Sequence, residues 1–448
     1  MAGECTTNWN PPEDWSEWVE WLSLGLHGRS RWRLPLIFIG VVLANGRRTV
    51  TSWLRAAGLS LEFREYYYFL YSIGQRIPQV AEQFLWLLIT KLPIGERVLF
   101  ALDDTPTTRY GPEVQGAGLH HNPTSSPDDH KFIYGHIWIT LALVVRHPRW
   151  HTIAFPFWAR LYVKAKDVDK LREHYEWQFQ TKLELAGEMI TQVAQRLQKA
   201  GKVVWVVMDG AYAYRPLLHV ILPLGVVVVS RLRTDASLRT VPIPAKKGSK
   251  GARRKYGQER ISLCKRAAQK SGWQEVECVL YGGQKITKTC KTFLATYHVV
   301  RGTLRVVLVK EANSWEVFFC TDPNATVAEI LEAYADRSSI EQTFADVKES
   351  WGAGQQQVRD VSSNLASFHL NLWSYSLTEL WSWSRCATTL RDRSQSPWDD
   401  AHRRPSHADR RKALRMAIIG DQIQVALAPK PDKRKIKKLF KTLAQLAA

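Results

Sequence analysis

The stretch T-V-A-E-I-L-E-A-Y-A-D-R-S-S-I-E-Q-T-F-A-D-V-K, residues 326–348, decides how the rest of the chain is interpreted. Thr326 is followed three residues later by Glu329, which is the capping-box signature of a helix start. The following residues include neither Pro nor Gly and are mostly good helix formers. The segment therefore predicts one helix of several turns.

Four polar side chains share one face of this predicted helix. At about 100° per residue, they fall within an arc of roughly 60°: Tyr334, Arg337, Glu341 and Lys348. An apolar stripe beside the arc would pack on a core: Ile340, Phe344 and Val347. A carboxylate flanked by two cations and a phenol suits the binding of a phosphate next to a metal ion. The alternative is an ordinary surface ion pair between Arg337 and Glu341.

Composition indicates a partner with negative charge. The chain has 448 residues, of which 45% are hydrophobic, and a formal net charge of +20. Such a surplus favours nucleic acid or an anionic membrane surface. The longest apolar run, Leu34 to Ala44, is shorter than the ~18 residues of a spanning helix, so we expect no membrane partner. Residues 1–12 are polar and show no signal peptide.

The cysteines lie far apart, at positions 5, 264, 278, 290, 320 and 386, without a Cys-x-x-Cys pair. This spacing predicts neither a zinc knuckle nor a disulfide framework. We expect a reducing cytoplasm, with association to the nucleoid if the partner is DNA.

The N-terminal part, residues 1–92, has the pattern of a helical region. Leu36 to Ala44 and Thr49 to Ala57 predict two helices around the turn Asn45-Gly46, with the size of a helix-turn-helix. Arg47 and Arg48 would then lie at the start of the second helix, where they could contact DNA phosphates. An ordinary helical hairpin fits the same residues equally well.

From residue 97 the pattern becomes that of an α/β protein. Val98 to Leu102 is an apolar run that ends in Asp103-Asp104-Thr105, and Val203 to Met208 is another that ends in Asp209. Buried strands of this kind predict a sheet with acids gathered at one edge. Further strands are predicted at 132–145, 150–155 and 225–230, and an amphipathic helix at 169–200. The histidines at 120, 121 and 130 fall in a predicted loop and would be solvated.

Residues 233–322 show β-like alternation and carry a Gly-rich basic tract at 246–260. We expect its cations to contact DNA, rather than to form a solvated charge run: Arg253, Arg254 and Lys255. After the Glu341 helix, residues 365–383 predict an apolar helix packed on the sheet, and 391–412 a flexible segment. The chain is thus divided into five regions: 1–92, 93–232, 233–322, 323–388 and a basic tail, 389–448.

Three acids from distant positions could meet in this arrangement. The oxygen ligands of Asp104, Asp209 and Glu341 suit Mg²⁺ or Mn²⁺. We expect two ions, since a pair can stabilise both the attacking and the leaving oxygens in phosphodiester chemistry. Such a site needs no side-chain nucleophile.

The spacing Tyr334-x2-Arg337-x3-Glu341-x6-Lys348 resembles the Y-R-E-K signature of bacterial insertion-sequence transposases of the DDE class. D-D-T at 103–105 resembles the first acidic motif of that family, and M-D-G-A-Y at 208–212 the second. W-G-A-G-Q-Q-Q-V-R from 351 and H-L-N-L-W-S from 369 resemble the pattern on the C-terminal side of its Glu. The resemblance covers about 97–383.

The resemblance implies an RNase H-like mixed sheet with flanking helices, a β-rich insertion before the catalytic Glu helix, and a separate helical N-terminal region. It implies Asp104, Asp209 and Glu341 as catalytic metal ligands, with Asp104 preferred to Asp103 because the family's Asp precedes Thr. Tyr334, Arg337 and Lys348 would hold the phosphates of the transposon end. Trp315, two residues before the motif's position at Val317, would stack on a flipped base.

The function implied is a DNA transposase that binds terminal inverted repeats as a homodimer, cuts them and joins them to target DNA. Two alternatives stay open. One is a catalytically inactive or domesticated DNA-binding protein. The other is an RNase H-like nuclease in repair or RNA processing.

Overall fold

The computed structural model describes residues 9–122, 131–172, 177–243, 254–280, 283–394, 396–400 and 402–426, and in the tail residues 433, 434, 436, 437, 439, 440 and 443. Within these ranges, no helix combines the length and the apolar character needed to cross a membrane. The described cysteines are all free thiols. The absence of a disulfide framework is therefore confirmed for this part of the chain.

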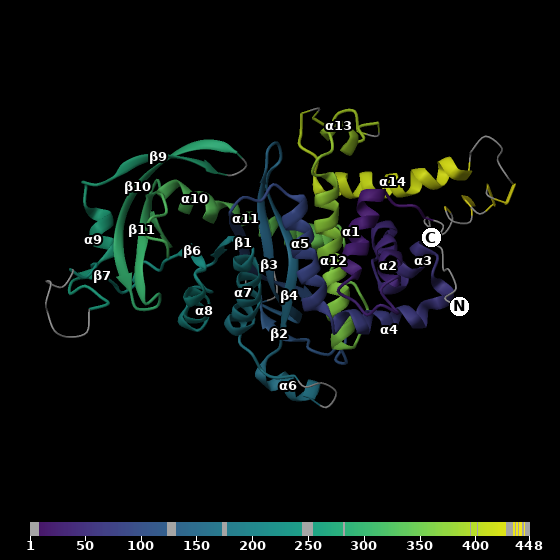
Figure 1. Ribbon diagram of the computed structural model, residues 1–448, viewed down its shortest axis with the longest axis horizontal. Helices are drawn as coiled ribbons and strands as arrows, with labels where there is room; N and C mark the ends of the chain where they lie inside the picture. Colours follow the sequence, from purple (N-terminus) through teal and green to yellow (C-terminus); the bar gives the residue numbers. More distant parts are fainter. Residues whose placement is uncertain are drawn as a thin grey trace.

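One mixed sheet runs through the described part of the molecule (Figure 1). Its strands are β1 Arg97–Thr108, β2 Gly118–His121, β3 Phe132–His147, β4 His151–Tyr162, β5 Val203–Met208, β6 Val227–Arg231, β7 Leu238–Arg239, β8 Arg260–Ile261, β9 Gln274–Leu280, β10 Gln284–Tyr297, β11 Gly302–Lys310 and β12 Trp315–Cys320. The order is β2-β3-β1-β5-β6-β12-β11-β10-β7-β8, with β4 on β3 and β9 on β10. β1, β5 and β6 are parallel, and the other pairs are antiparallel. The predicted mixed α/β sheet is confirmed.

The β-rich stretch before the Glu341 helix extends the core sheet. β12 pairs with β6 in antiparallel register, with Phe319 opposite Ser230, and β11 and β10 come next outward. Figure 1 shows these strands as a curved wing on one side of β1 and β5. The sheet therefore continues without a break from the acidic edge into the insertion.

The helices are α1 Glu13–Ser23, α2 Arg33–Leu43, α3 Val50–Ala57, α4 Phe63–Gly74, α5 Ile77–Lys91, α6 Ala165–Arg172, α7 Lys182–Lys199, α8 Arg215–Ile221, α9 Leu263–Ala268, α10 Val327–Asp336, α11 Ser338–Glu349, α12 Val361–Ser382, α13 Ala387–Leu390 and α14 His407–Ala426. The predicted hairpin of α2 and α3 is confirmed: Thr49 caps α3, and Gly58 ends it with a left-handed φ of 81°.

Helix α12 is the centre of the packing. It is buried along almost its whole length, and it lies between β4 and the N-terminal helices (Figure 1). It packs closely on α4, where a Cβ added at Gly74 would lie 1.9 Å from the Ser362 carbonyl oxygen. The two helix backbones are therefore in direct contact, and the predicted packing of this helix on the sheet is confirmed.

The sheet has apolar cores on both faces. Phe100 and Leu102 of β1 join the core that contains α7 and α12, whereas Ala101 joins the core that contains Ile340 and Phe344 of α11. This alternation arises from the two-residue repeat of a strand. α7 and α11 thus flank β1 from opposite faces.

The predicted single helix over 326–348 is wrong in one respect, because it is divided at Arg337. The Arg337 N–H bonds to Tyr334 O, three residues back, in place of the usual four. Ser338 and Ser339 also donate their hydroxyls to the carbonyls of Ala335 and Asp336. Such side-chain bonds compete with the helical ladder and interrupt it here.

Three other predictions need correction. β1 does not end at Asp103 but pairs with β3 up to Thr108. His120 is not solvated, because it lies on β2, is buried, and packs near the Tyr162 ring; His121 is exposed, and His130 lies outside the described residues. The predicted helix 169–200 is two helices, α6 and α7, and α7 begins at the Thr181–Glu184 capping box.

The predicted flexible segment 391–412 is also wrong at its end, where α14 begins. Ser406 and Asp409 form a reciprocal cap: the Ser406 N–H donates to Asp409 Oδ2, and the Asp409 N–H donates to Ser406 Oγ. The spacing S-x-x-D is a start signal that the sequence displays. Within the buried core, His407 and Arg410 then bind Glu379 of α12.

Candidate active site

Two parallel strands bring the first acids together. Leu102 of β1 and Met208 of β5 are the last partners of their parallel ladder, so Asp103 and Asp209 come next at the same edge. This is where the sequence predicted that acids would gather. Because β1 continues beyond that edge on β3, Asp104 also lies on a fixed strand rather than in a loop.

Asp103 and Asp104 point to opposite faces of β1. Asp103 Oδ2 accepts a hydrogen bond from Arg337 Nη1 at 2.7 Å, on the face covered by α11. Asp104 Oδ2 accepts from Lys182 Nζ of α7 at 2.7 Å, and its Oδ1 accepts from the Tyr212 hydroxyl at 2.7 Å. The two neighbouring carboxylates therefore serve different sets of partners.

Arg337 bridges the sheet and the helix that carries Glu341. Its Nη2 donates to Glu341 Oε1 at 2.7 Å, while Nη1 holds Asp103. Its guanidinium also lies 5.5 Å from the centre of the Tyr334 ring, within cation–π range. The Arg337 side chain is only 15% exposed, whereas that of Glu341 is 56% exposed. The pair thus belongs to a partly buried cluster and is not an isolated surface ion pair.

Burial dominates the electrostatics of this cluster. It raises the pKa of Asp103 to about 6, although the charge of Arg337 and a hydrogen bond from the Asp104 N–H oppose the rise. It also raises the pKa of Tyr212, whose hydroxyl is held by Asp104, well above its ordinary value. Both groups are therefore set in a site from which water is largely excluded.

The carboxylates fit a divalent cation by their chemistry, since Mg²⁺ and Mn²⁺ prefer oxygen ligands. Within the described ranges, however, no three His, Cys, Asp or Glu side chains are grouped closely enough to hold a metal ion. Arg337 occupies the position between Asp103 and Glu341. An ion that bridged these two carboxylates would have to displace the guanidinium.

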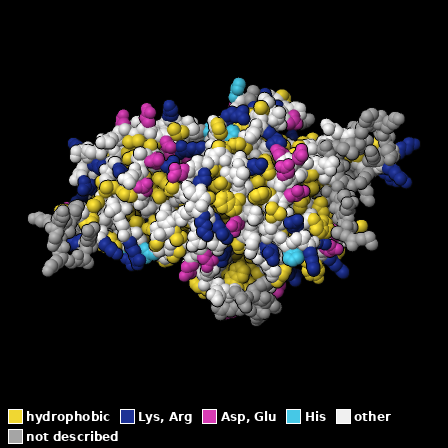
Figure 2. Space-filling view, viewed as in Figure 1, with side chains coloured by type: hydrophobic (Ala, Val, Ile, Leu, Met, Phe, Trp, Pro, Cys, Tyr) yellow, Lys and Arg dark blue, Asp and Glu magenta, His cyan; other side chains and the backbone are white. Residues whose placement is uncertain are grey.

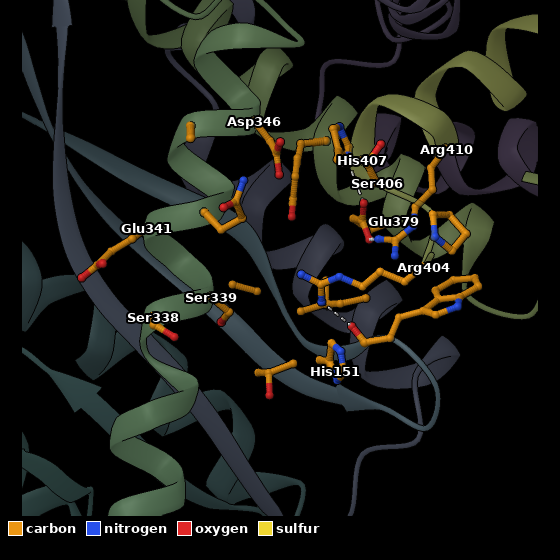
Figure 3. Close-up of a pocket in the computed structure, with 18 of the residues that line it drawn as sticks. His151, Ser338, Ser339, Glu341, Asp346, Glu379, Arg404, Ser406, His407 and Arg410 are labelled. Carbon is orange, nitrogen blue, oxygen red and sulfur yellow. Dashed lines mark hydrogen bonds and ion pairs between the residues drawn. The ribbon is translucent and has the colours of Figure 1, made fainter. Parts of the chain in front are cut away.

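A cleft of about 940 Å³ opens beside Glu341. α11 forms one wall, and the segment 403–410 and the turn at His151 form the other (Figure 3). Figure 3 shows Glu341 at the rim, with its carboxylate directed away from Arg404 and Arg410. Deeper in, Glu379 is neutralised by Arg410 and accepts from His407, so this wall is already internally paired.

A second cleft, of about 710 Å³, lies at the other end of α11. It brings together two residues that the sequence predicted as DNA contacts, Arg47 and Lys348, next to Pro106 and Thr108 of β1. Burial lowers the pKa of Lys348. The lining of this cleft contains no acidic side chain among the described residues, so its charge is positive.

The other predicted DNA contacts lie apart from the acids. Arg48 faces α14, and Arg254 and Lys255 are exposed on the insertion; Arg253 lies outside the described residues. Trp315 shares a core with Val317 and Phe319 of β12, whereas the ring of Phe318 packs on that of Tyr334, with their centres 4.7 Å apart. On the face seen in Figure 2, Lys and Arg side chains lie at several separate places with acidic ones between them.

Two site residues escaped the sequence analysis. Tyr212 stands inside the M-D-G-A-Y motif, three residues after Asp209, so its position was a usable signal. Lys182 comes directly after the Thr181 cap and lies in the first turn of α7, but its ion pair with Asp104 spans 78 residues. Only the folded sheet brings these two residues to the same carboxylate.

An α/β sheet with acids at the end of its parallel strands, flanked by basic clefts, defines a class of enzyme that acts on polyanionic substrates. Residues 23–290 match the family described as DDE superfamily endonuclease, and the chain therefore belongs to this superfamily. The superfamily has the RNase H-like fold and usually uses divalent metals, and membership indicates a nuclease-type enzyme with a DNA substrate. The match ends before α10, so Glu341 lies beyond it. None of the curated proteins compared matches the chain.

Proposed function

We propose that the protein is a DNA transposase that cuts the ends of an insertion element and transfers them to target DNA. The observation that carries the proposal is the Asp103–Arg337–Glu341 bridge, which joins α11 to the strand edge where Asp209 comes after β5. Superfamily membership supports the nuclease chemistry, and the resemblance of residues 334–348 to the Y-R-E-K signature supports transposition.

In this proposal, Asp104, Asp209 and Glu341 hold two Mg²⁺ or Mn²⁺ ions. When bound, the ions would supply activation of water or a DNA 3′-OH and stabilisation of the departing oxygen. The Lys182 ammonium and the Tyr212 hydroxyl fix the Asp104 carboxylate in one orientation and favour its ionised form. The contacts of Asp103 with Arg337 make it the competing candidate for the first ligand position.

Arg337, Tyr334 and Lys348 would hold phosphates of the cleaved end. A phosphate could replace one carboxylate on the Arg337 fork, because guanidinium groups bind both with the same two-point geometry. Lys348, with Arg47, lines the basic cleft farther along α11. Arg254 and Lys255, with Arg253, would contact DNA from the insertion, and Trp315 remains the proposed stacking residue.

The proposed partners are the terminal inverted repeats and target DNA, bound by a homodimer in a synaptic complex. The helical region 1–92 would contribute to recognition of the ends through the α2–α3 hairpin, the core would lie in 93–232 and 323–388, and the insertion in 233–322. A cytoplasmic protein associated with the nucleoid would meet such DNA directly.

The test is a cleavage assay on labelled DNA that contains the sequence flanking the gene. We expect cuts at the element's ends with Mg²⁺ or Mn²⁺, none with EDTA, and none with Glu341→Gln or Asp209→Asn. These variants should bind the same DNA within a few fold of wild type, because they change ligands of the metal and not phosphate contacts. Binding without any cutting by the wild type would instead favour an inactive DNA-binding descendant.

Two further variants in the same assay decide the first ligand position. If Asp104 is the ligand, Asp104→Asn abolishes cutting, and Asp103→Asn keeps much of it. The reverse pattern would assign the position to Asp103. The exposed carboxylate of Asp235, which pairs with the nearby Arg233, provides the control: Asp235→Asn should cut like wild type.

A further inference from the structure

Three arginines from two distant segments meet beside the α2–α3 turn. Arg48 lies in this turn, and Arg411 and Arg415 lie one turn apart on α14. The mutual charge repulsion of these guanidiniums contributes to lowering the pKa of Arg411, together with burial, which is the larger cause, to about 9. Burial and the charge of Arg48 also lower the pKa of Arg415. Like charges are thus held close together in a partly buried place.

The contacts of these guanidiniums go to uncharged groups. Arg411 Nη2 donates to the carbonyls of Ala44 at 2.9 Å and Val42 at 3.3 Å, and Arg48 Nη1 donates to the Glu349 carbonyl at 3.3 Å. Arg415 donates to the side-chain oxygen of Asn45. The Nε atoms of all three arginines are buried without a hydrogen-bond partner among the described residues. The cluster therefore retains both charge and donors.

A structural role explains only part of this cluster. The carbonyls of Val42 and Ala44 end α2, so Arg411 caps that helix, and its guanidinium also lies 4.9 Å from the Trp351 ring centre. A helix C-terminus carries only about half an elementary negative charge. Three guanidiniums carry three positive charges. Most of the charge is therefore left for an anion from outside the chain.

The cluster continues from the basic cleft that begins near the acids. Arg47 and Lys348 line that cleft, and the next residue, Arg48, turns toward α14. The turn is fixed in this position because the Arg48 N–H donates to Gln355 Oε1 at 2.8 Å and Gln356 Nε2 donates to Arg48 O at 2.9 Å. Pro106 and Thr108 of β1, just past Asp104, line the same cleft.

We infer that Arg48, Arg411 and Arg415 form a binding site for backbone phosphates of duplex DNA, at the end of a basic path that leads from Asp104 through Lys348 and Arg47. The inference rests on the proposed function, because the DNA that reaches the acids is the DNA that this path would hold. It assigns to α14 a role in substrate binding that neither its sequence nor the superfamily match indicates.

The experiment measures how the binding of a short random-sequence duplex depends on salt, in EDTA so that no cutting occurs. Backbone contacts do not depend on sequence, and each one lost lowers the slope of log K against log salt by about 0.9. We expect this loss for Arg415→Gln and for Arg48→Gln, and a wild-type slope for Arg415→Lys. Arg411 is left unchanged because it caps α2.

Lys412 provides the matched control. It lies on the same helix and pairs with Asp392, so Lys412→Gln removes the same charge but should keep the wild-type slope. Thermal melts identify any variant that fails to fold, and the other variant then carries the test. A wild-type slope in both folded glutamine variants would overturn the inference, while cutting that depends on Glu341 would leave the proposed function intact. Failure of wild type to bind duplex DNA at all would overturn both.

Discussion

At the scale of single residues, the position of Arg337 between two helices determines what its side chain reaches. It lies at the joint of α10 and α11, from which one nitrogen reaches Asp103 and another reaches Glu341. The sequence predicted the Arg337–Glu341 neighbourhood, because i and i+4 positions are adjacent on a helix. It could not predict the Asp103 contact, because that partner is 234 positions away.

A buried histidine makes a second residue-scale prediction, on pH. His369 of α12 accepts a hydrogen bond from the Ala159 N–H through Nε2 at 3.0 Å, and its Nδ1–H donates to Leu365 O at 2.8 Å. Burial lowers its pKa from 6.5 to about 4. The unfolded chain therefore takes up a proton near pH 6.5, whereas the folded protein resists it until about pH 4. The free energy of unfolding should fall as pH drops through this window, by about 3 kcal/mol in total from this group.

Thermal or urea unfolding of wild type and His369→Gln between about pH 7 and 4 checks this expectation. The variant should be less stable at neutral pH but should lose less stability on acidification. His121→Gln, at an exposed position of β2, should keep the wild-type pH dependence. Parallel curves for wild type and His369→Gln would show that His369 does not titrate differently on folding.

At the scale of elements, the segment between α11 and α12 ties the site together. Arg109 at the end of β1 donates to the carbonyls of Gly354 at 3.0 Å and Gln356 at 2.7 Å, and its Nε–H donates to His136 on β3. Gln355 and Gln356 hold the backbone of Arg48. The segment W-G-A-G-Q-Q-Q-V-R-D thus connects β1, the N-terminal turn and both flanking helices. The sequence marked this segment only by its resemblance to a family motif, and these partners could not be predicted from it.

Gly354 offers a test of this segment. Its φ is +99°, a conformation that residues with a side chain rarely adopt, and an added Cβ would lie 3.3 Å from Thr107 Cβ. Gly354→Ala should therefore lower the free energy of unfolding by about 1–3 kcal/mol. It should also weaken DNA binding, because Gln355 and Gln356 would no longer fix the Arg48 turn. Chemical denaturation and the duplex-binding assay measure the two effects.

Gly28→Ala is the control, since nothing lies within 4 Å of its added Cβ and its φ is not in the left-handed region. It should change neither property by much. Wild-type stability in Gly354→Ala would show that the segment tolerates rearrangement, and the role of the two glutamines would then need another explanation.

At the scale of the whole molecule, α12 joins the N-terminal helices to the sheet. It packs on β4 on one side and on α4 on the other, with α14 beside it. The length and apolar character of residues 365–383 predicted a buried helix, because these are local properties. Its place between two layers is a property of the tertiary structure. For the same reason, the continuous sheet from β6 through β12 was not visible in the change of pattern after residue 232.

A substitution at Gly74 should therefore weaken both layers together. The Cβ of Gly74→Ala would overlap the Ser362 carbonyl oxygen and force α4 and α12 apart. We expect faster amide hydrogen exchange in α4 and also in β4 on the far side of α12, together with a lower Tm. Gly95→Ala, whose Cβ meets nothing within 4 Å, should exchange like wild type. Faster exchange confined to α1–α5 would contradict the shared packing and indicate a helical unit that opens independently.

The central position of α12 has a consequence for synthesis on the ribosome. Chains fold from the N-terminus as they emerge, yet the helix that covers β4 and α4 is made only after residue 360. Until then, the nascent protein exposes apolar surfaces on both the sheet and the N-terminal helices, and Glu341 has no stable position opposite Asp103. Such a chain would depend on chaperones until its last quarter is translated, and premature termination before α12 would yield an insoluble product rather than a partly active nuclease.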